Sequence, residues 1–240
     1  MPTAGTSTRI DEVGDGIFRI STPVTAIPGG FTFNQYLLVD DEPLLFHTGM
    51  RATFPAVRAA IESVLPLARL RWVAFAHVES DECGAYRELL DAAPAARPLC
   101  GRTQAMLAIG DLTDREPRVL ADGETHATGR RRLTWIDAPH VPHGWDNGFL
   151  FEATTRTLLC GDLFTQGGGE HAPVTEGDVL GPSEALRAKL PYFALGPNTT
   201  AVIERLAATN PVLLACMHGS AWRGDGGSLL RTLATALAGR

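Results

Sequence analysis

The sequence predicts an α+β fold in which two β-sheets pack against each other and helices cover their outer faces. Short segments rich in branched and aromatic residues, typical of strands, occur at the start of the chain, in its middle and near its end. Segments with helical spacing of apolar residues lie between these strands and after them. Because sheets and helices must each bury an apolar face, this order favours a sheet-on-sheet core flanked by helices.

Each element follows from a local pattern. "GIFRIST" and "QYLLVD" have the composition of antiparallel strands, and "TFPAVRAAIESVLP" repeats apolar residues at helical spacing after an N-cap threonine, Thr53. By the same criteria, strands are predicted at 16–22, 35–40, 43–49, 71–76, 97–101, 131–139, 148–154, 156–164 and 211–218. Helices are predicted at 53–66, 85–93, 103–109, 183–190, 198–209 and 228–238.

The composition favours one domain over residues 1–240. Hydrophobic residues make up 45% of the chain, which is enough for a full core, and the net charge of −6 argues against a nucleic-acid partner. The N-terminal residues lack the pattern of a secretory signal, and no stretch approaches the roughly 20 apolar residues of a membrane span. We therefore expect a cytoplasmic protein that binds neither nucleic acid nor membrane. The cysteines lie far apart without a CxxC pattern, which predicts buried thiols.

Potential ligands follow several of the apolar strands. His77, Asp162 and His218 each stand where an apolar run ends, and the loop "DAPHVPHGWD" adds His140 and His143. Loops held by a rigid sheet are the usual place for binding and catalytic residues. Taken alone, His77-x-Glu79-x-Asp81 fits a solvated acidic loop as well as a metal site, and each lone histidine fits a structural role. Together they favour a metal site, because imidazole and carboxylate at alternating positions can face two cations.

The order His77-x-Glu79-x-Asp81, His143, Asp162, His218 resembles the metallo-β-lactamase fold superfamily over nearly the whole chain. The resemblance implies a four-layer αββα sandwich with two metal ions at its edge. Hydrolytic members carry HxHxDH in the first motif, whereas this chain has Glu79 for the second histidine and Glu82 for the last. Glu79 is the pattern of the flavodiiron proteins and of the stand-alone oxygen-binding di-iron proteins, which lack a flavodoxin domain.

Further residues agree with that branch, and the resemblance implies a role for each. Asn34 in "TFNQYLLV" and Trp145 and Asp146 in "HGWDN" match it, as does "CGDLF". The first metal would take His77, Glu79, His143 and Asp162, and the second Asp81, Asp162 and His218, with Asp162 bridging. The residues expected near the metals without binding them are Glu82, Asn34, His47, His140, Trp145, Asp146 and Tyr192. Because the chain ends soon after the last motif, no flavodoxin domain and no flavin are expected.

The donor set favours iron over zinc or manganese. Three carboxylates and three neutral imidazoles form a hard, anionic set that stabilises trivalent iron. We therefore expect a di-iron protein that binds or reduces O₂ or another diatomic molecule, as a sensor with a signalling partner or as an oxidoreductase with an external electron donor. The alternatives are a two-metal hydrolase of a thioester, lactone or phosphodiester, and a metal-free binding module on the same fold. The sequence predicts no oligomeric state.

Overall fold

The structure is a computed structural model that describes residues 8–239, and these form two mixed β-sheets. The strand order is β1-β2-β3-β4-β5-β6-β7 in the first sheet and β12-β14-β13-β11-β10-β9-β8 in the second. In chain order the strands are β1 (Arg9–Gly14), β2 (Ile17–Val24), β3 (Phe31–Leu38), β4 (Leu44–Phe46), β5 (Trp72–Ala74), β6 (Arg97–Gly101), β7 (Arg118–Leu120), β8 (Thr125–Ala127), β9 (Arg132–Asp137), β10 (Gly148–Glu152), β11 (Thr157–Leu159), β12 (Val174–Thr175), β13 (Leu213–Ala215) and β14 (Ala221–Arg223).

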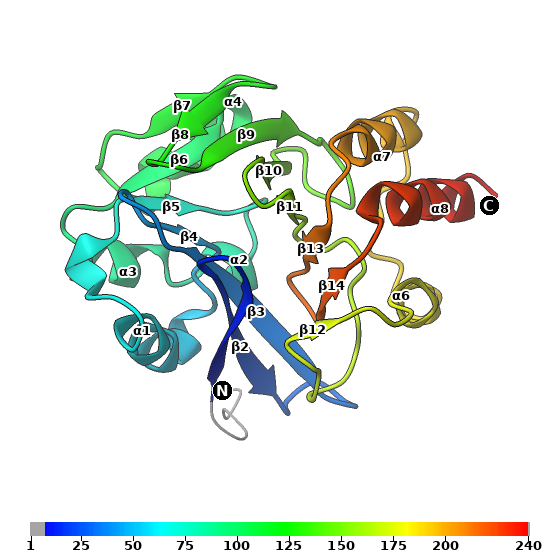
Figure 1. The fold of residues 1–240 in the computed structure, drawn as a ribbon, viewed down its shortest axis with the longest axis horizontal. Coiled ribbons are helices and arrows are strands. Elements are labelled where there is room, and N and C mark those ends of the chain that lie inside the picture. Colours follow the sequence, from blue (N-terminus) through cyan, green and yellow to red (C-terminus); the bar gives the residue numbers. More distant parts are fainter. Residues whose placement is uncertain (1–7, 240) are drawn as a thin grey trace.

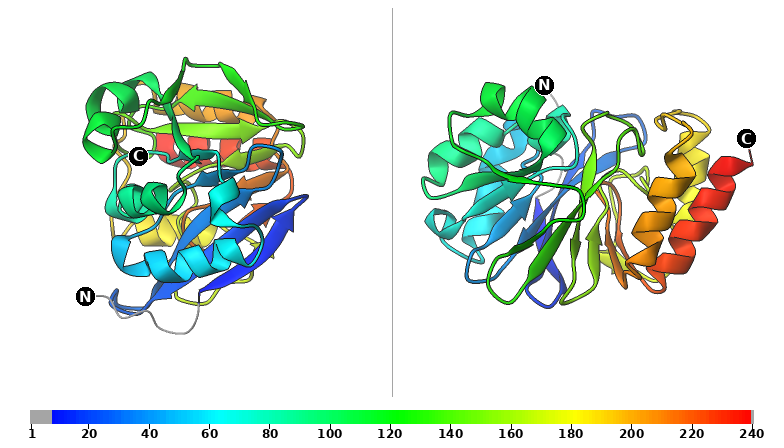
Figure 2. Two further views of the ribbon diagram at one scale, coloured as in Figure 1. Left: turned by 90° about the vertical axis from the view of Figure 1, so that its left-hand side faces the viewer. Right: turned by 90° about the horizontal axis from the view of Figure 1, so that it is seen from above.

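Helices lie on the outer faces of both sheets, so that the fold has four layers (Figure 1; Figure 2). The α-helices are α1 (Phe54–Glu62), α2 (Ser80–Cys83), α3 (Tyr86–Ala92), α4 (Arg102–Gln104), α5 (Gly110–Leu112), α6 (Leu180–Arg187), α7 (Thr199–Ala208) and α8 (Gly226–Ala238), and a π-helical segment covers Ala105–Ile109. The predicted αββα sandwich is confirmed. Among residues 8–239, no helix combines the length and the apolar character needed to cross a bilayer.

Successive side chains of a strand point to opposite faces of its sheet, and this separates the core into layers. On β3, Leu37 packs with α1 and α3 on the outer side, whereas Tyr36 and Leu38 point into the space between the sheets. On the other side, α7 and α8 cover the second sheet through residues such as Ile203 and Leu230. Each sheet therefore buries both faces, which is why the short strands β4, β5, β11 and β13 are almost wholly apolar.

Parallel pairing brings the predicted ligands to one edge of the sandwich. β4 and β5 are parallel neighbours in the first sheet, and β11 and β13 are parallel neighbours in the second. Their carboxyl ends therefore lie on the same side of each sheet, and the loops that follow them carry His47, His77, Asp162 and His218. It stays a prediction that residues 1–240 form one domain and that the protein is cytoplasmic.

Candidate metal centre

His77 is fixed by the strand that precedes it. The main chain beyond β5 is held by the buried side chain of Gln104, whose Nε2 donates to the carbonyl oxygens of Phe75 at 3.1 Å and Ala76 at 2.8 Å. The His77 side chain is almost fully buried. After Glu79, whose backbone is extended, the chain enters α2, so Asp81 and Glu82 lie in the first turn of this short helix.

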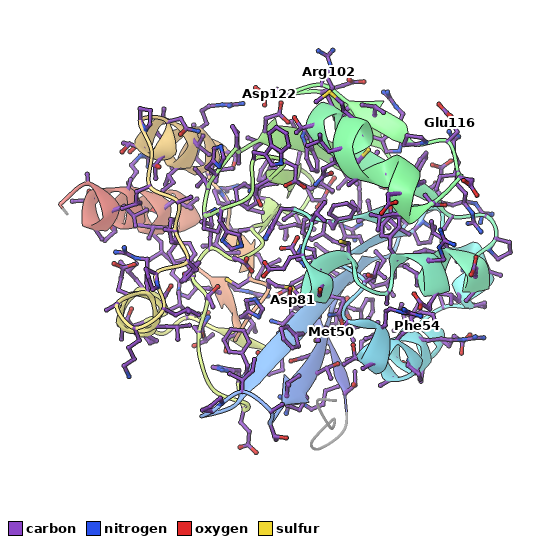
Figure 3. The ribbon with its side chains drawn as sticks, turned by 180° about the vertical axis from the view of Figure 1, so that it is seen from behind. Met50, Phe54, Asp81, Arg102, Glu116 and Asp122 are labelled. Carbon is purple, nitrogen blue, oxygen red and sulfur yellow. The ribbon has the colours of Figure 1, made fainter. Side chains whose placement is uncertain are left out.

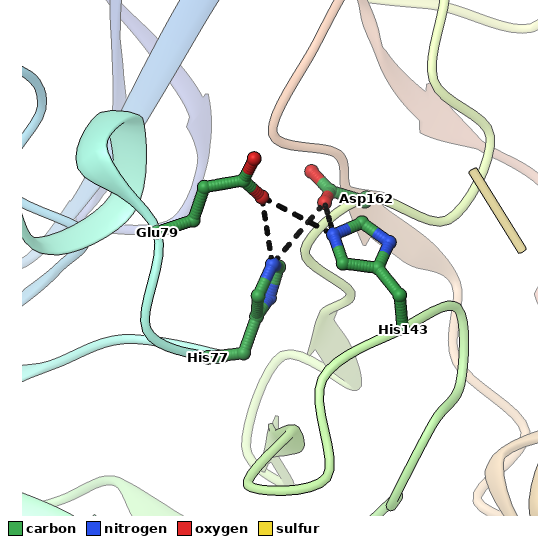
Figure 4. Close-up of side chains that lie close together, drawn as sticks. All are labelled: His77, Glu79, His143 and Asp162. Carbon is green, nitrogen blue, oxygen red and sulfur yellow. Dashed lines mark hydrogen bonds and ion pairs between the residues drawn. The ribbon is translucent and has the colours of Figure 1, made fainter. Parts of the chain in front are cut away.

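Four of the predicted ligands meet in one cluster, His77, Glu79, His143 and Asp162 (Figure 4). Oε2 of Glu79 lies 2.9 Å from Nε2 of His77 and 3.1 Å from Nε2 of His143. Oδ2 of Asp162 lies 3.3 Å from the same His143 nitrogen and 3.7 Å from that of His77. One ligand atom from each of the four residues lies within 4.8 Å of all the others. These atoms surround a common point, as the ligands of one metal ion do.

A second group lies on the other side of Asp162. Oδ1 of Asp162 is 3.1 Å from Nε2 of His218, and Oδ2 of Asp81 is 3.4 Å from the same nitrogen. The two oxygens of Asp162 therefore face different histidines. Oδ1 is buried and makes no hydrogen bond. A buried carboxylate oxygen without a donor is costly unless a cation neutralises it.

His218 is held from the first sheet. Its Nδ1 lies 2.8 Å from the carbonyl oxygen of Thr32, so the Nδ1 proton is donated there and Nε2 is left to face the acids. Asn34 also fixes the segment around His218, because its Nδ2 donates to the carbonyl oxygens of Cys216 and Gly219. The ring of Phe31 packs on the imidazole with centroids 4.3 Å apart.

The loop that carries His143 is fastened to the loop of His77. Oδ2 of the buried Asp146 accepts the backbone N–H of Val78 at 2.9 Å. Gly144 has φ +73°, and a Cβ built there would lie 3.1 Å from the Cβ of His77. The close approach of the two loops and the positive φ both favour glycine at this position.

The electrostatics of the cluster favour a bound cation. Burial alone lowers the pKa of His77, but the nearby carboxylates, chiefly Glu82 and Glu79, raise it to about 10. Hydrogen bonds from His143 and His77 hold the pKa of Glu79 below its usual range. Burial raises the pKa of Asp81 to about 6. The surplus of carboxylates thus keeps positive charge on the imidazoles, and metal ions that replace those protons would supply the same charge.

Two of the residues expected beside the metals, His140 and Trp145, have exposed side chains, Trp145 by 60%. Their roles stay a prediction. His140 contributes only its backbone N–H, which donates to the carbonyl oxygen of Gly144. The "PHVPHGWD" pattern could not separate the inward His143 from the outward His140, because a loop without strand or helix periodicity does not fix side-chain direction.

Glu82, His47, Asn34, Asp146 and Tyr192 do lie at or behind the cluster. Glu82 and His47 are fully buried beneath His77. The Tyr192 ring stands edge-on to His143 with centroids 6.3 Å apart. The sequence did not predict the contacts of Gln104, Thr32 and Phe31 with the site. These residues reach the site only through the tertiary fold, and none of them belongs to a recognisable motif.

A cavity of about 340 Å³ opens onto both groups of ligands. Its polar wall includes Asp81, Asp162 and His218 of the second group, and Glu79 and His143 of the first. Met50 also lines the cavity, and Figure 3 shows where Met50 and Asp81 lie. The rest of its lining is mainly apolar, with Ile27, Phe31, Phe33, Leu186, Leu190 and Tyr192 among the residues concerned. The donor atoms, and the buried Asp162 oxygen that faces His218 without a hydrogen bond, fit two metal ions beside this cavity.

These features define a class of protein, the αββα sandwiches with a candidate metal site at the edge of two sheets. Comparison with known families matches residues 31–179 to the family described as ODP family beta lactamase. The chain belongs to this family, which lies in the predicted metallo-β-lactamase superfamily.

Relatives agree with the flavodiiron branch. The chain is 26% identical over 223 residues to a nitric oxide reductase of Moorella thermoacetica, covering 88% of this chain and 55% of that protein. It is 26% identical over 211 residues to a rubredoxin-oxygen oxidoreductase of Megalodesulfovibrio gigas, covering 83% and 51%. The chain thus spans about half the length of the curated relatives it matches.

Solved structures share the fold. The flavodiiron protein of Giardia intestinalis superposes with a TM-score of 0.82 at 16% identity, over 97% of this chain and 60% of that chain. A fragment of a diflavin flavoprotein from Nostoc superposes with a TM-score of 0.78 at 16% identity, over 97% and 94%.

Proposed function

We propose that this protein is a non-haem di-iron protein that binds or reduces O₂. One observation carries the proposal: the Glu79 carboxylate stands between His77 and His143, at 2.9 and 3.1 Å from their Nε2 atoms. A carboxylate at this place makes the donor set more anionic, and anionic oxygen donors favour iron and its trivalent state. The names of the two curated relatives, which refer to nitric oxide and to oxygen, support the same choice.

In this proposal, the first iron is held by His77, Glu79, His143 and Asp162, and the second by Asp81, Asp162 and His218. Two ferrous ions at these positions would supply electrons and an open coordination position for O₂. The open position belongs to the second group, because fewer protein ligands serve it, and the cavity gives a small ligand access to it.

The apolar lining of the cavity suits a small uncharged ligand. The rings of Phe31 and Phe33 lie against His218 with centroids 4.3 and 5.5 Å away, and they keep the site apolar enough for a small uncharged ligand. Burial raises the pKa of Tyr192 to about 12, so its hydroxyl, which lies 3.3 Å from Oγ of Ser183, stays protonated beside the cavity.

The electrons for repeated turnover come, in our proposal, from a separate redox protein. The relative from M. gigas is named for rubredoxin, a protein electron donor, and this supports the same class of donor here. If the protein is a sensor, the partner is instead a signalling protein that distinguishes the oxygen-bound form.

The test is to load metal-free protein with two equivalents of ferrous iron without air and then admit O₂. The proposal predicts a new visible absorption band and the uptake of O₂ by the iron-loaded protein, with neither in the zinc-loaded protein. Loaded protein that shows neither change would refute it.

The cavity volume favours a second candidate, a two-metal hydrolase. A space of about 340 Å³ exceeds what a diatomic molecule needs and lies within the range of small-molecule sites. Turnover of a thioester, lactone or phosphodiester by the zinc-loaded protein, lost in Asp162→Ala, would favour this function over the first.

A further inference from the structure

We propose that Glu82 is a positioning residue whose carboxylate holds the His77 ring so that Nε2 faces the metal, and that His47 holds Glu82 in turn. The proposal rests on the metal site of the proposed function, although not on its reaction with O₂.

Three buried polar atoms meet behind His77. Oε1 of Glu82 lies 3.3 Å from Nδ1 of His77 and 3.4 Å from Nε2 of His47. All three atoms are buried, and none of them has a hydrogen bond to any other group, so these two contacts are the polar contacts that they make. Burying unpaired polar atoms is costly, so their convergence indicates that they serve one another.

The chemistry of the three groups determines which nitrogen of each imidazole carries the proton. A carboxylate oxygen has two lone pairs and can accept from both imidazoles, provided that His77 carries its proton on Nδ1 and His47 carries its own on Nε2. With its proton on Nδ1, His77 presents an unprotonated Nε2 toward Glu79 and Asp162. A carboxylate behind a ligand histidine also makes the imidazole a stronger donor.

The main chain holds Glu82 rigidly in this position. Its other oxygen, Oε2, accepts the backbone N–H of His77 at 2.7 Å, so one carboxylate contacts both the backbone and the ring of the same residue. The backbone N–H of Thr48 donates to the carbonyl oxygen of Glu82 at 2.6 Å, which fastens α2 to the segment after β4. His47 lies in that segment with φ +67°, a conformation unfavourable for a residue other than glycine.

These contacts separate Glu82 from the ligands. Neighbouring residues on a helix point in directions about 100° apart, and on α2 Asp81 faces the cavity while Glu82 faces the interior. The Glu82 side chain is 0% exposed, and both of its oxygens are directed at His77 and His47. Glu82 therefore acts on the first metal through His77.

The experiment measures Co²⁺ binding to the full chain, using the visible spectrum of bound cobalt as the readout. His218→Ala removes a ligand of the second group, so titration in that background reports the His77 group. Glu82→Leu and Glu82→Gln are each added to this background, with the exposed Glu62→Gln as control. In parallel, ¹⁵N NMR of the zinc-loaded chain with His218 intact reports which His77 nitrogen carries the proton.

We expect Co²⁺ affinity to fall about 100-fold in Glu82→Leu and about tenfold in Glu82→Gln, which keeps an acceptor but loses the charge. We also expect the zinc-bound His77 of Glu82→Leu to show a mixture of forms with the proton on Nδ1 or on Nε2, because the ring can then turn and bind zinc through either nitrogen. Glu62→Gln should keep the proton on Nδ1. Should Glu82→Leu fail to fold, Glu82→Gln decides the result alone.

Unchanged Co²⁺ affinity in the Glu82 variants would overturn the proposal. So would a cobalt spectrum showing one ligand fewer on the first metal, or the loss of the second metal when Glu82→Gln is made with His218 intact, because Glu82 would then be a ligand. Since cobalt binding needs no O₂, a failure here and a failure of the oxygen chemistry are separate results.

Discussion

Oδ1 of Asp162 lies 3.1 Å from Nε2 of His218, on the opposite side of the carboxylate from the oxygen that faces His77 and His143. Asp162 follows Gly161, whose φ of +47° turns the chain sharply after β11. This turn places one carboxylate between the two groups of ligands, each of which draws residues from both sheets.

Asp162→Ala should therefore remove both metal ions, whereas loss of a ligand that serves one group should remove only one. The expected result is fewer than one tightly bound metal per chain, measured by elemental analysis after gel filtration. Asp91→Ala, an exposed change on α3, is the control. Two metals retained by Asp162→Ala would rule out the bridging role.

Glu79→His should keep metal binding but weaken the oxygen chemistry. An imidazole still binds metal, yet it removes one negative charge from the donor set and so favours zinc and divalent iron. We expect the rate of O₂ uptake by the ferrous protein to fall at least tenfold, measured with an oxygen electrode. An unchanged rate would show that the charge of Glu79 does not control the reaction.

The stabilisation that metal gives should increase with pH. The folded-state pKa of His77 is about 10, above the ordinary value of 6.5, so proton binding stabilises the metal-free fold fully below pH 6.5 and progressively less up to about pH 10. Metal ions take over from these protons. The difference in Tm between zinc-loaded and metal-free protein should be larger at pH 8.5 than at pH 6.5, and an equal or smaller difference would contradict the electrostatic account.

Asp146→Ala should lower both stability and metal affinity. The change removes a charged acceptor from the N–H of Val78, at a cost of about 1.5 to 3 kcal/mol in the free energy of unfolding. Asp178→Ala is a matched control, because that carboxylate also accepts a backbone N–H at 2.9 Å but is exposed, and about 0.5 kcal/mol is expected there. Urea unfolding and Co²⁺ titration measure the two effects. Equal costs for the two variants would mean that Asp146 does not anchor the loop.

The sequence predicted most of the layers and the cluster, because both depend on local patterns. Apolar runs such as "VAFAH" mark buried strands, and a ligand at a strand end keeps its place when the strand pairs with its neighbours. The helices α7 and α8 show the same point: their apolar spacing predicts helices with one buried face, and the structure packs those faces on the second sheet.

What the sequence could not predict depends on tertiary contacts. Thr53 stands at the predicted N-cap of α1, yet its hydroxyl donates to the carbonyl oxygen of Met50 and does not cap the helix. β12 and β14 are too short and too polar to have a strand pattern. β14 is held by pairing with β13, and β12 in turn pairs with β14 at the edge of the sheet. The direction of Glu82 likewise follows from the packing of α2 against the segment after β4.

The most direct test of the central claim is the metal content of the protein as isolated, combined with its spectrum before and after exposure to O₂. The account predicts two iron ions per chain and a visible absorption that appears with O₂ and disappears on reduction. Two zinc ions per chain, with no spectral response to O₂ after replacement by ferrous iron, would contradict it.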